Sequence, residues 1–473
     1  MLLRMIYDEE LAQAAYLLGC EASGEAIVVD PQRDVDRYID LAEANALRIT
    51  TVAETHVHAD FVSGARELAE RTGATVCVSG AGGPDWTPAW LDSKSGGGSY
   101  DHRLLAEGDV IRIGSIELKA MHTPGHTPEH MTYLVTDTAA ARSPLGMLSG
   151  DFVFVGDLGR PDLLESAAGY ASVAAPAARE LAASARRLAD LPDHLQIWPG
   201  HGAGSACGKA LGAVPQSTLG YERLVNPGLR LAADDDAFAE YALGGQPEPP
   251  RYFGRMKRVN IEGPPVLGGL PIPRRLENHQ LTALHTTTAV VDCRRWADFR
   301  ERHIPGALFS PLGKSFHTFA GSYLEPGEDI VLIVPERRLE HAVRSLVRIG
   351  FDRVIGWAPP QAIESLPASE LQSAPEISVE RMAELQESGS PSVLDVRRAV
   401  EHAAGAIPRA LNIAHTRLAE RMDELTPGET VYVHCRSGVR SAAACSLLLK
   451  RGFDAVNIAG GMLAWQQLAR ERV

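Results

Sequence analysis

The segment Thr55-His56-Val57-His58-Ala59-Asp60-Phe61 decides the fold of the N-terminal part of this 473-residue chain. It follows an apolar run at Ile49–Ala53 that we predict to be a strand, and it precedes a predicted helix at Ala65–Arg71. Residues two apart in an extended segment point to the same side, so His56 and His58 can face one cavity. The segment therefore predicts that two imidazoles stand together at the end of a strand.

Three further candidate ligands follow along the chain. His126, Asp151 and His201 each lie just beyond a predicted apolar strand, and each is preceded by a glycine that permits a tight turn. Imidazoles and carboxylates that converge at strand ends form a metal site. A single histidine would be better interpreted as an unrelated surface residue, but this ordered series favours the metal site. His122 and His130 match no ligand position, and we interpret them as packing or surface residues.

The last 200 or so residues contain an internal repeat. Residues 292–309 read DCRRWADFRERHIPGALF and residues 395–412 read DVRRAVEHAAGAIPRALN, which align at an offset of 395 − 292 = 103 residues. Each copy has a strand, a short charged helix, a second apolar run and an amphipathic helix that ends at Gly-Phe-Asp. Such strand–helix alternation indicates a parallel sheet covered by helices.

Composition excludes several classes of protein. There are 46 basic and 60 acidic residues, a net charge of −14, which argues against nucleic acid and membrane surfaces as partners. Six scattered cysteines are too few for a disulfide scaffold. The N-terminus lacks a signal-peptide pattern, and no run of 18 apolar residues occurs. We expect a cytoplasmic, multidomain protein with reduced thiols. The composition is also compatible with a homo-oligomer.

A second motif lies near the C-terminus, where a predicted strand ends at Cys435. Loop N–H groups and a helix N-terminus would point at its sulfur, while Arg436 and Arg440 add positive charge. This arrangement stabilises a thiolate, a persulfide or an oxyanion, so we predict that Cys435, Arg436 and Arg440 are catalytic. The loop residues predicted to bind the substrate are Ser437, Gly438 and Val439. The alternative is a buried structural cysteine.

Over roughly residues 1–260, the ordered motifs resemble the metallo-β-lactamase superfamily. In the binuclear zinc hydrolases of that superfamily, one metal takes the positions that match His56, His58 and His126. The resemblance gives the other metal Asp60, residue 61 and His201, with Asp151 as the bridge. Residue 61 is Phe here, and a phenyl ring cannot coordinate a metal, so the resemblance implies one metal per chain.

The mononuclear branch that this chain resembles is the persulfide dioxygenases. That resemblance implies Fe(II) held by His56, His126 and Asp151, two imidazoles and a carboxylate with open positions. It also implies that His58, Asp60 and His201 orient ligands or waters.

Two further residues near the site have open roles. Arg160 matches a family arginine near the substrate, with a surface salt bridge as the alternative. Cys207, in a glycine-rich loop after His201, is a candidate catalytic residue that could accept a sulfane sulfur. The alternative for Cys207 is a small buried core cysteine.

The second repeat resembles a rhodanese domain, a sulfurtransferase, through Asp395-Val396-Arg397, the loop CRSGVR and Gly460-Gly461-Met462. Cys435 and Arg440 enclose four residues, which is the rhodanese spacing, whereas the related cell-cycle phosphatases have one more. In the first copy the loop is about two residues shorter, and Pro335 stands near the cysteine position. We therefore predict a rhodanese-like fold without its nucleophile, with a spacer or docking role.

Together these resemblances predict an α/β protein: an αββα metallo-β-lactamase sandwich (1–262) followed by two three-layer parallel-sheet rhodanese-like domains (263–372 and 373–473). The implied reaction oxidises a small-molecule persulfide with O₂ to sulfite and thiol, and Cys435 then transfers sulfur to form or use thiosulfate. The alternatives are a zinc-dependent thioester hydrolase of the glyoxalase II type and a non-catalytic persulfide sensor or carrier. The identity of the thiol carrier stays open.

Overall fold

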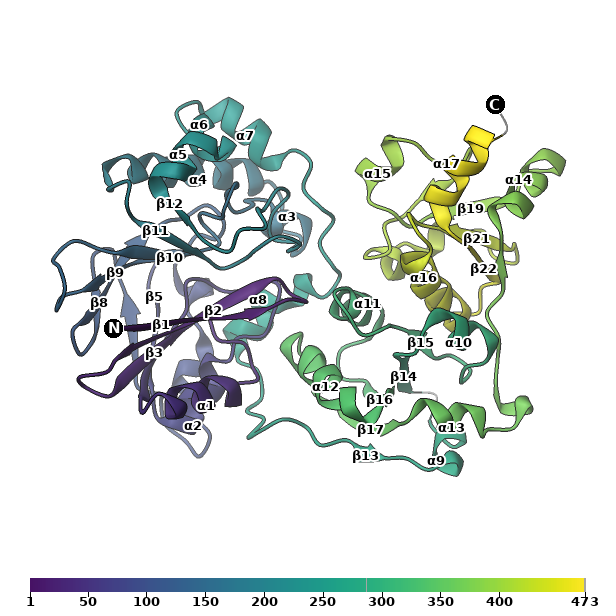
Figure 1. Ribbon diagram of the computed structural model, residues 1–473, viewed down its shortest axis with the longest axis horizontal. Coiled ribbons are helices and arrows are strands. Elements are labelled where there is room, and N and C mark those ends of the chain that lie inside the picture. The colour runs from purple at the N-terminus through teal and green to yellow at the C-terminus, as the bar shows by residue number, and fades with distance from the viewer. Residues whose placement is uncertain (286, 472–473) are drawn as a thin grey trace. The chain divides into compact units, whose positions relative to one another are not determined.

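The computed structural model describes residues 1–285 and 287–471, and it divides into two compact units (Figure 1). Unit 1 comprises Met1–Leu270 with Val347–Gly350, and unit 2 comprises Pro271–Leu346 with Phe351–Val473. The second repeat lies in unit 2, and so does the first except for Val347–Gly350. Among the helices of the described residues, none combines the length and the apolar character that a membrane crossing requires.

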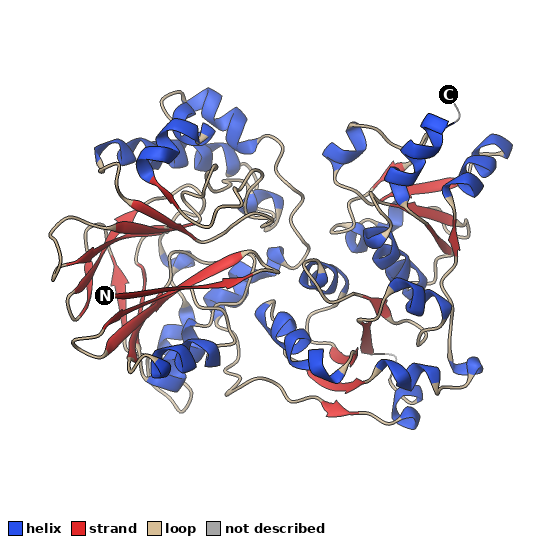
Figure 2. Ribbon diagram, viewed as in Figure 1, coloured by secondary structure: helices blue, strands red, loops and turns tan. Residues whose placement is uncertain are grey.

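Unit 1 is built on two six-stranded sheets, ordered β1-β2-β3-β4-β5-β6 and β12-β11-β10-β9-β8-β7. Figure 2 shows these strands as two layers with helices on their outer faces, so the predicted αββα sandwich is confirmed. The strands of the first sheet are β1 (Leu2–Asp8), β2 (Gln13–Cys20), β3 (Glu25–Val29), β4 (Arg48–Ala53), β5 (Thr75–Ser79) and β6 (His102–Leu105). Those of the second are β7 (Val110–Ile113), β8 (Ile116–His122), β9 (Met131–Asp137), β10 (Gly146–Gly150), β11 (Gln196–Pro199) and β12 (Ser217–Thr218).

The two faces of strand β2 explain how the layers hold together. Side chains alternate along a strand, and Tyr16 and Leu18 join the core between the two sheets. Ala15 and Leu17 point the other way and join the core beneath the covering helices. The helices of unit 1 are α1 (Asp36–Ala44), α2 (Ala65–Thr72), α3 (Leu163–Ser166), α4 (Ala174–Arg187), α5 (Leu219–Val225), α6 (Pro227–Leu231), α7 (Asp235–Leu243) and α8 (Phe253–Glu262).

Unit 2 contains two five-stranded sheets whose pairs are all parallel, ordered β13-β17-β16-β14-β15 and β18-β22-β21-β19-β20. The order is the same in both, as an internal repeat requires. The strands are β13 (Arg274–Arg275), β14 (Thr288–Asp292), β15 (Leu308–Phe309), β16 (Asp329–Ile333), β17 (Val354–Ala358), β18 (Glu376–Ile377), β19 (Ser392–Asp395), β20 (Leu411–Asn412), β21 (Val431–His434) and β22 (Ala455–Ile458).

Helices cover both faces of these sheets in unit 2 (Figure 2). They are α9 (Asn278–Thr282), α10 (Trp296–Glu301), α11 (Phe316–Tyr323), α12 (Leu339–Arg348), α13 (Pro360–Glu364), α14 (Val379–Ser388), α15 (Ala399–Ala403), α16 (Val439–Lys450) and α17 (Gly461–Glu471).

Strand register identifies which residue of the first copy stands where the second has its cysteine. Asp395 pairs with His434 between β19 and β21, and Asp292 pairs with Ile333 between β14 and β16. The residue after His434 is Cys435, so its counterpart is Val334, a buried valine. Pro335, which the sequence places near this position, is one residue further on.

Candidate metal centre and thiol site

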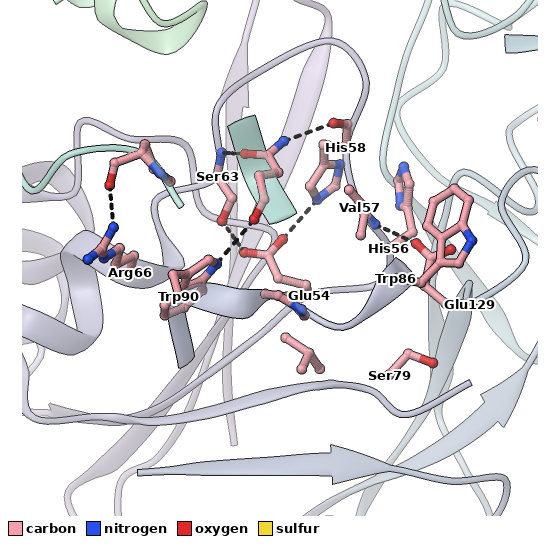
Figure 3. A pocket seen from close by; sticks show the side chains of 14 residues that line it. Glu54, His56, Val57, His58, Ser63, Arg66, Ser79, Trp86, Trp90 and Glu129 are labelled. Atoms are coloured by element: carbon pink, nitrogen blue, oxygen red, sulfur yellow. Dashed lines mark hydrogen bonds and ion pairs between the residues drawn. The ribbon is translucent and has the colours of Figure 1, made fainter. Parts of the chain in front are cut away.

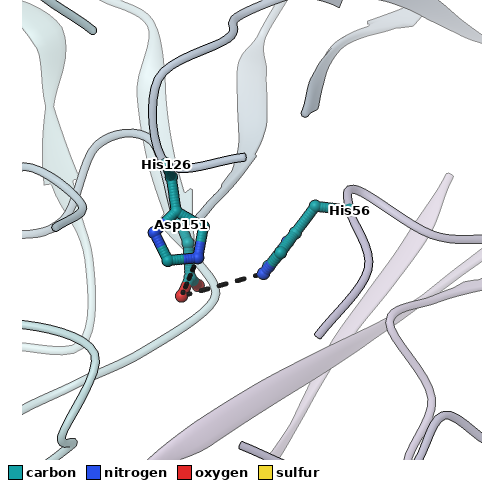
Figure 4. A group of neighbouring side chains, drawn as sticks. All are labelled: His56, His126 and Asp151. Atoms are coloured by element: carbon teal, nitrogen blue, oxygen red, sulfur yellow. Dashed lines mark ion pairs between the residues drawn. The ribbon is translucent and has the colours of Figure 1, made fainter. Parts of the chain in front are cut away.

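Three side chains that are distant in the sequence converge in unit 1 where strands of both sheets end. His56 follows β4 of the first sheet, while His126 and Asp151 follow β8 and β10 of the second. Figure 4 shows both rings turned toward the Asp151 carboxylate. Asp151 Oδ2 lies 3.4 Å from His126 Nε2 and 3.9 Å from His56 Nε2. The structure thus brings together the three residues that we predict as iron ligands.

Hydrogen bonds set the tautomer of both histidines. His126 Nδ1 lies 2.9 Å from the Arg160 carbonyl oxygen, which can only accept, so Nδ1 carries the proton. The Thr55 hydroxyl donates its one hydrogen to Asp30 Oδ2 and therefore accepts from His56 Nδ1, 3.0 Å away. Both Nε2 atoms are then left with a free lone pair that points at Asp151. Metal-binding histidines are oriented in this way by a partner on the other ring nitrogen.

The Asp151 carboxylate is the strongest sign that a cation belongs here. Its side chain is 1% exposed, and neither oxygen has a hydrogen-bond partner among the described residues. Burial lowers the pKa of both His56 and His126, with further lowering at His56 from neighbouring histidines. Neutral imidazoles cannot balance a buried carboxylate, whereas a divalent metal can. The donor set fits a metal ion.

A second buried group adjoins the first. His201 follows β11, and its Nε2 lies 3.3 Å from Asp60 Oδ2 and 3.5 Å from Asp151 Oδ1. The Cys207 sulfur falls in the same cluster, within 4.8 Å of the ligand atoms of Asp60 and His201. Burial and the charges of Asp60 and Asp151 raise the pKa of the Cys207 thiol well above its usual range. Cys207 is buried, as its alternative interpretation expects, but beside the metal centre.

His58 belongs to a third buried group, with Glu54 and Asp30. Its Nε2 lies 2.9 Å from Glu54 Oε2 and 3.2 Å from Asp30 Oδ1. Burial alone would lower the pKa of His58, but these two carboxylates raise it well above the usual value. The ring of Phe61 packs on that of His58, with centroids 4.2 Å apart. His58 thus carries a proton toward the carboxylates, while its Nδ1 is buried without a hydrogen-bond partner.

Two residues of this centre were missed by the sequence interpretation. His130 is fully buried, and its Nε2 accepts from the Asp151 backbone N–H at 3.1 Å, so it is neither a surface nor a simple packing residue. Asp30 accepts from the Thr55 backbone N–H at 2.6 Å and so positions the segment that carries His56. The signal for Asp30 was present, because it directly follows an apolar strand, as Asp151 does. The sequence held no comparable signal for His130.

Arg160 is 1% exposed, so the alternative of a surface salt bridge is wrong. Its guanidinium makes a bidentate pair with Asp162 (2.7 and 2.6 Å) and donates to the carbonyls of Ala206 and Pro247. Its own carbonyl accepts from His126. These contacts assign Arg160 a positioning role for His126 and the Cys207 loop, and contact with a substrate stays a prediction.

Three cavities surround the centre. One of about 30 Å³, room for one or two waters, lies beside His56 and His58 (Figure 3). Glu54 and Glu129 line it, and burial raises the pKa of each to about 7. A second cavity reaches His126, and it shares Trp86, Leu164 and Lys257 with a third of about 280 Å³ that also contains Tyr170. The second cavity, at about 20 Å³, has room for about one water, so the larger one adjoins the centre only through it.

In unit 2, Cys435 directly follows β21 and lies in the short loop that leads into α16, as predicted. The Gly438 backbone N–H and the Ser441 hydroxyl point at its sulfur, at 3.1 and 3.5 Å. The Cys435 carbonyl accepts from the Met462 N–H at 2.8 Å. A Cβ on Gly461 would lie 2.4 Å from that carbonyl oxygen, so only glycine permits this packing. The sulfur is buried in a donor-lined pocket.

The two arginines of the loop are placed differently. Arg440 makes a bidentate pair with Glu401 at 2.7 and 2.8 Å, so part of its charge is neutralised there. Arg436 and Ser437 are exposed, and Val439, at 49% exposure, begins α16. The structure thus brings Gly438 to the sulfur, while the catalytic and substrate-binding roles of the other loop residues stay predictions.

Comparisons with known proteins match both the N-terminal part of the chain, which holds the metal centre, and the C-terminal part, which holds the thiol site. The model of the "Metallo-beta-lactamase superfamily" matches residues 8–201, and that of the "Rhodanese-like domain" matches residues 378–468. The crystal structure of a metallo-beta-lactamase from Staphylococcus aureus subsp. aureus COL is 36% identical. That similarity covers 76% of this chain and 99% of the other, with a TM-score of 0.67.

Two curated relatives resemble the N-terminal part. A "Probable metallo-hydrolase" of Burkholderia pseudomallei is 32% identical over 181 residues, which cover 32% of this chain and 58% of the relative. The mitochondrial persulfide dioxygenase of Mus musculus is 27% identical over 238 residues, 50% of this chain and 78% of the relative. The chain spans 58%, 63% and 64% of the length of the first three curated relatives it matches.

Proposed function

Because the chain belongs to the metallo-β-lactamase superfamily and carries a rhodanese-like domain at its C-terminus, we propose that it is a sulfur-metabolism enzyme with two activities. Its first unit oxidises a low-molecular-weight persulfide with O₂ in an iron-dependent reaction. Its Cys435 transfers sulfur. The observation that carries the proposal is the group His56, His126 and Asp151, in which two free imidazole nitrogens face an unpartnered buried carboxylate.

Iron held by these three residues would supply the redox chemistry that joins a persulfide to O₂. The reaction balances as RSSH + O₂ + H₂O → RSH + SO₃²⁻ + 2 H⁺, in which the outer sulfur is oxidised and O₂ is reduced. The similarity to the mouse persulfide dioxygenase supports this reaction. Phe61 supports it as well, because this residue removes a ligand that the binuclear hydrolases of the superfamily use.

The chain's own residues prepare the centre for that chemistry. The Arg160 carbonyl and the Thr55 hydroxyl hold His126 and His56 in the tautomer that leaves Nε2 free. His130 holds the backbone of Asp151. The three ligands are therefore positioned before any metal binds, which limits the reorganisation that binding requires.

The cavities indicate how a substrate reaches the centre. In the larger one, the Lys257 ammonium lies 3.9 Å from the centroid of the Trp86 ring and donates to the Tyr170 hydroxyl at 3.0 Å. A carrier with an acidic group would find a cation there, and its persulfide could extend along the shared wall toward His126.

At the second site, the Cys435 thiolate would attack the outer sulfur of a persulfide and release the thiol, RSH. Sulfite would then attack the outer sulfur of the Cys435 persulfide, forming thiosulfate and restoring the thiolate. The Gly438 N–H and the Ser441 hydroxyl stabilise negative charge on sulfur during both steps. Two active sites in one chain raise the effective concentration of the sulfite they share.

The decisive experiment loads the metal-free full chain anaerobically with Fe(II) or with Zn²⁺ and measures O₂ uptake after addition of a persulfide. We expect one O₂ consumed per sulfite formed with iron, and none with zinc. Thioester hydrolysis by the zinc form, without O₂ uptake by the iron form, would favour the glyoxalase II type of reaction instead. Persulfide binding without turnover in either form would favour a sensor or carrier.

A further inference from the structure

The first repeat contributes one short segment to unit 1, the residues Val347–Gly350. This segment contains the last residues of α12 and the turn that follows it. The last carbonyls of a helix have no partner inside the helix, and here two carbonyls at its end are satisfied by other residues of unit 1. The Arg348 carbonyl accepts from the Val62 N–H at 2.7 Å, and the Ile349 carbonyl accepts from the Arg255 guanidinium at 2.6 Å. The segment is therefore bonded into unit 1 through its backbone.

The side chain of Arg348 is buried between two carboxylates of unit 1. Its Nε and Nη2 atoms donate to the two oxygens of Asp34 at 2.9 and 2.6 Å, and its Nη1 atom donates to Asp8 Oδ2. Arg348 lies 314 and 340 residues along the chain from these partners. The two carboxylates are 2% and 7% exposed, and buried charges are tolerated only when they are paired and hydrogen-bonded. The first repeat thus supplies a cation that compensates them.

Asp8 connects this ion pair to the turn between β1 and β2. Its other oxygen, Oδ1, accepts from the Leu11 N–H at 2.7 Å. The turn ends at Ala12, whose φ of 51° lies in the left-handed region that residues other than glycine rarely adopt. The Ala12 carbonyl oxygen lies 3.0 Å from His201 Nδ1 and sets the tautomer of this ring. A strained turn that orients His201 is therefore held by Asp8, and Asp8 is held by Arg348.

The backbone of Arg348 holds a second segment of the same centre. Val62, which donates to the Arg348 carbonyl, comes two residues after Asp60. Asp60 Oδ2 lies 3.3 Å from His201 Nε2, and the same Nε2 lies 3.5 Å from Asp151 Oδ1. One residue of the first repeat thus supports both members of the pair Asp60 and His201. It acts through its guanidinium for His201 and through its carbonyl for Asp60.

We propose that Arg348 is a positioning residue for the metal centre, and that the first repeat, which lacks a nucleophile, serves the centre through it. Arg348 keeps the ring of His201 and the carboxylate of Asp60 in place beside Asp151, a predicted iron ligand. The proposal rests on the metal centre and not on the persulfide reaction, since a hydrolase with the same ligands would need the same support. The alternative is that Arg348 only stabilises the fold of unit 1, so the test must separate positioning from stability.

Nuclear magnetic resonance of the metal-free full chain with isotopically labelled histidine provides that test. The Nδ1–H groups of His201 and His126 each donate to a backbone carbonyl, and each signal is assigned by its absence from the variant that lacks that histidine. Arg348→Met removes the guanidinium but keeps the backbone carbonyl and a side chain of similar shape. We expect it to shift or broaden the His201 signal and to leave the His126 signal in place. A merely structural role would lower the unfolding temperature and leave both signals of the folded protein unchanged.

Iron affinity is the second readout. Loss of orientation by supporting groups typically costs about 10–100-fold in metal affinity, so we expect Arg348→Met to bind Fe(II) about 10-fold more weakly in competition with a chelator. Arg348→Lys keeps the charge but cannot bond both carboxylates with the same fork geometry, and it should restore part of the affinity. The matched control Arg353→Met removes an arginine of the same repeat that is 61% exposed and pairs with Asp329, and it should change neither readout.

Folded Arg348→Met with the His201 signal or the iron affinity of the unaltered chain would overturn the proposal. Should this variant fold poorly, Asp8→Asn keeps an oxygen for the Leu11 N–H and removes only the charge that Arg348 pairs with. An unmoved His201 signal in Asp8→Asn would also overturn the proposal. Persulfide-dependent O₂ uptake by the iron-loaded chain is measured separately. The proposed reaction can therefore fail while the role of Arg348 stands, and the reverse also holds.

Discussion

Gly200→Ala tests whether the metal centre depends on a close approach of backbone to ligand. A Cβ on Gly200 would lie 2.7 Å from Asp151 Oδ1 and 3.1 Å from the Gly150 carbonyl oxygen. The backbone around Gly200 cannot easily retreat, because its N–H donates to Gly150 and its carbonyl accepts from Ala14, each at 2.8 Å. To restore an ordinary contact of about 3.4 Å, the Asp151 carboxylate must move by roughly 0.7 Å.

A displacement of that size is large for a metal ligand. Loss of orientation by supporting groups typically costs about 10–100-fold in metal affinity, and a misplacement of about 1 Å can reduce turnover about 10²-fold. We therefore expect Gly200→Ala to bind Fe(II) at least 10-fold more weakly. Competition with a chelator of known affinity measures the binding, and an oxygen electrode measures persulfide-dependent O₂ uptake.

The matched control is Gly389→Ala, where the nearest atom to the new Cβ is the Leu385 carbonyl oxygen at 3.8 Å and the backbone is extended. This variant should keep its iron affinity. Circular dichroism and thermal unfolding establish that both variants are folded. If folded Gly200→Ala kept the iron affinity of the unaltered chain, Asp151 would not be a ligand in the position described.

Asp151→Ala should reduce O₂ uptake to background while thiosulfate-dependent transfer at Cys435 persists, and parallel loss of both activities would show that the two sites are not separate. Cys435→Ser in the full chain should continue to consume O₂ but accumulate sulfite in place of thiosulfate, as ion chromatography would reveal. Its sulfur transfer should fall to background, because Val334 stands at the cysteine position of the first repeat; residual enzymatic transfer would assign activity to another thiol. His130→Phe removes the hydrogen bonds that the ring makes with the Asp151 N–H and the Thr123 hydroxyl. Chemical denaturation should therefore show a loss of about 2–5 kcal/mol in the free energy of unfolding. An unchanged free energy of unfolding would contradict these two hydrogen bonds.

Sequence patterns were sufficient for most elements that carry the ligands. The predicted strand at Ile49–Ala53 matches β4 to within a residue, and the apolar strand predicted before His201 is β11. Their apolar runs are short and end abruptly at glycine or polar residues, which is a local signal. The internal repeat likewise predicted two sheets of one topology, because a repeated sequence pattern requires a repeated fold.

The hairpin β1–β2 was missed for a physical reason. Every residue of β2 is buried, since one face packs between the sheets and the other beneath helices. A strand buried on both faces has no alternation of polar and apolar residues to reveal it. This hairpin matters to the site, because the Ala12 carbonyl at its turn sets the tautomer of His201.

The sequence by itself determined which residues are candidate ligands, because residue type and local spacing are written in it. Tertiary structure decided how they are grouped. His58 turns toward Asp30 and Glu54, while Cys207 joins Asp60. Which side chains meet depends on the packing of two sheets whose strand ends come from segments distant in the sequence, and local spacing carries no information about which of these segments meet.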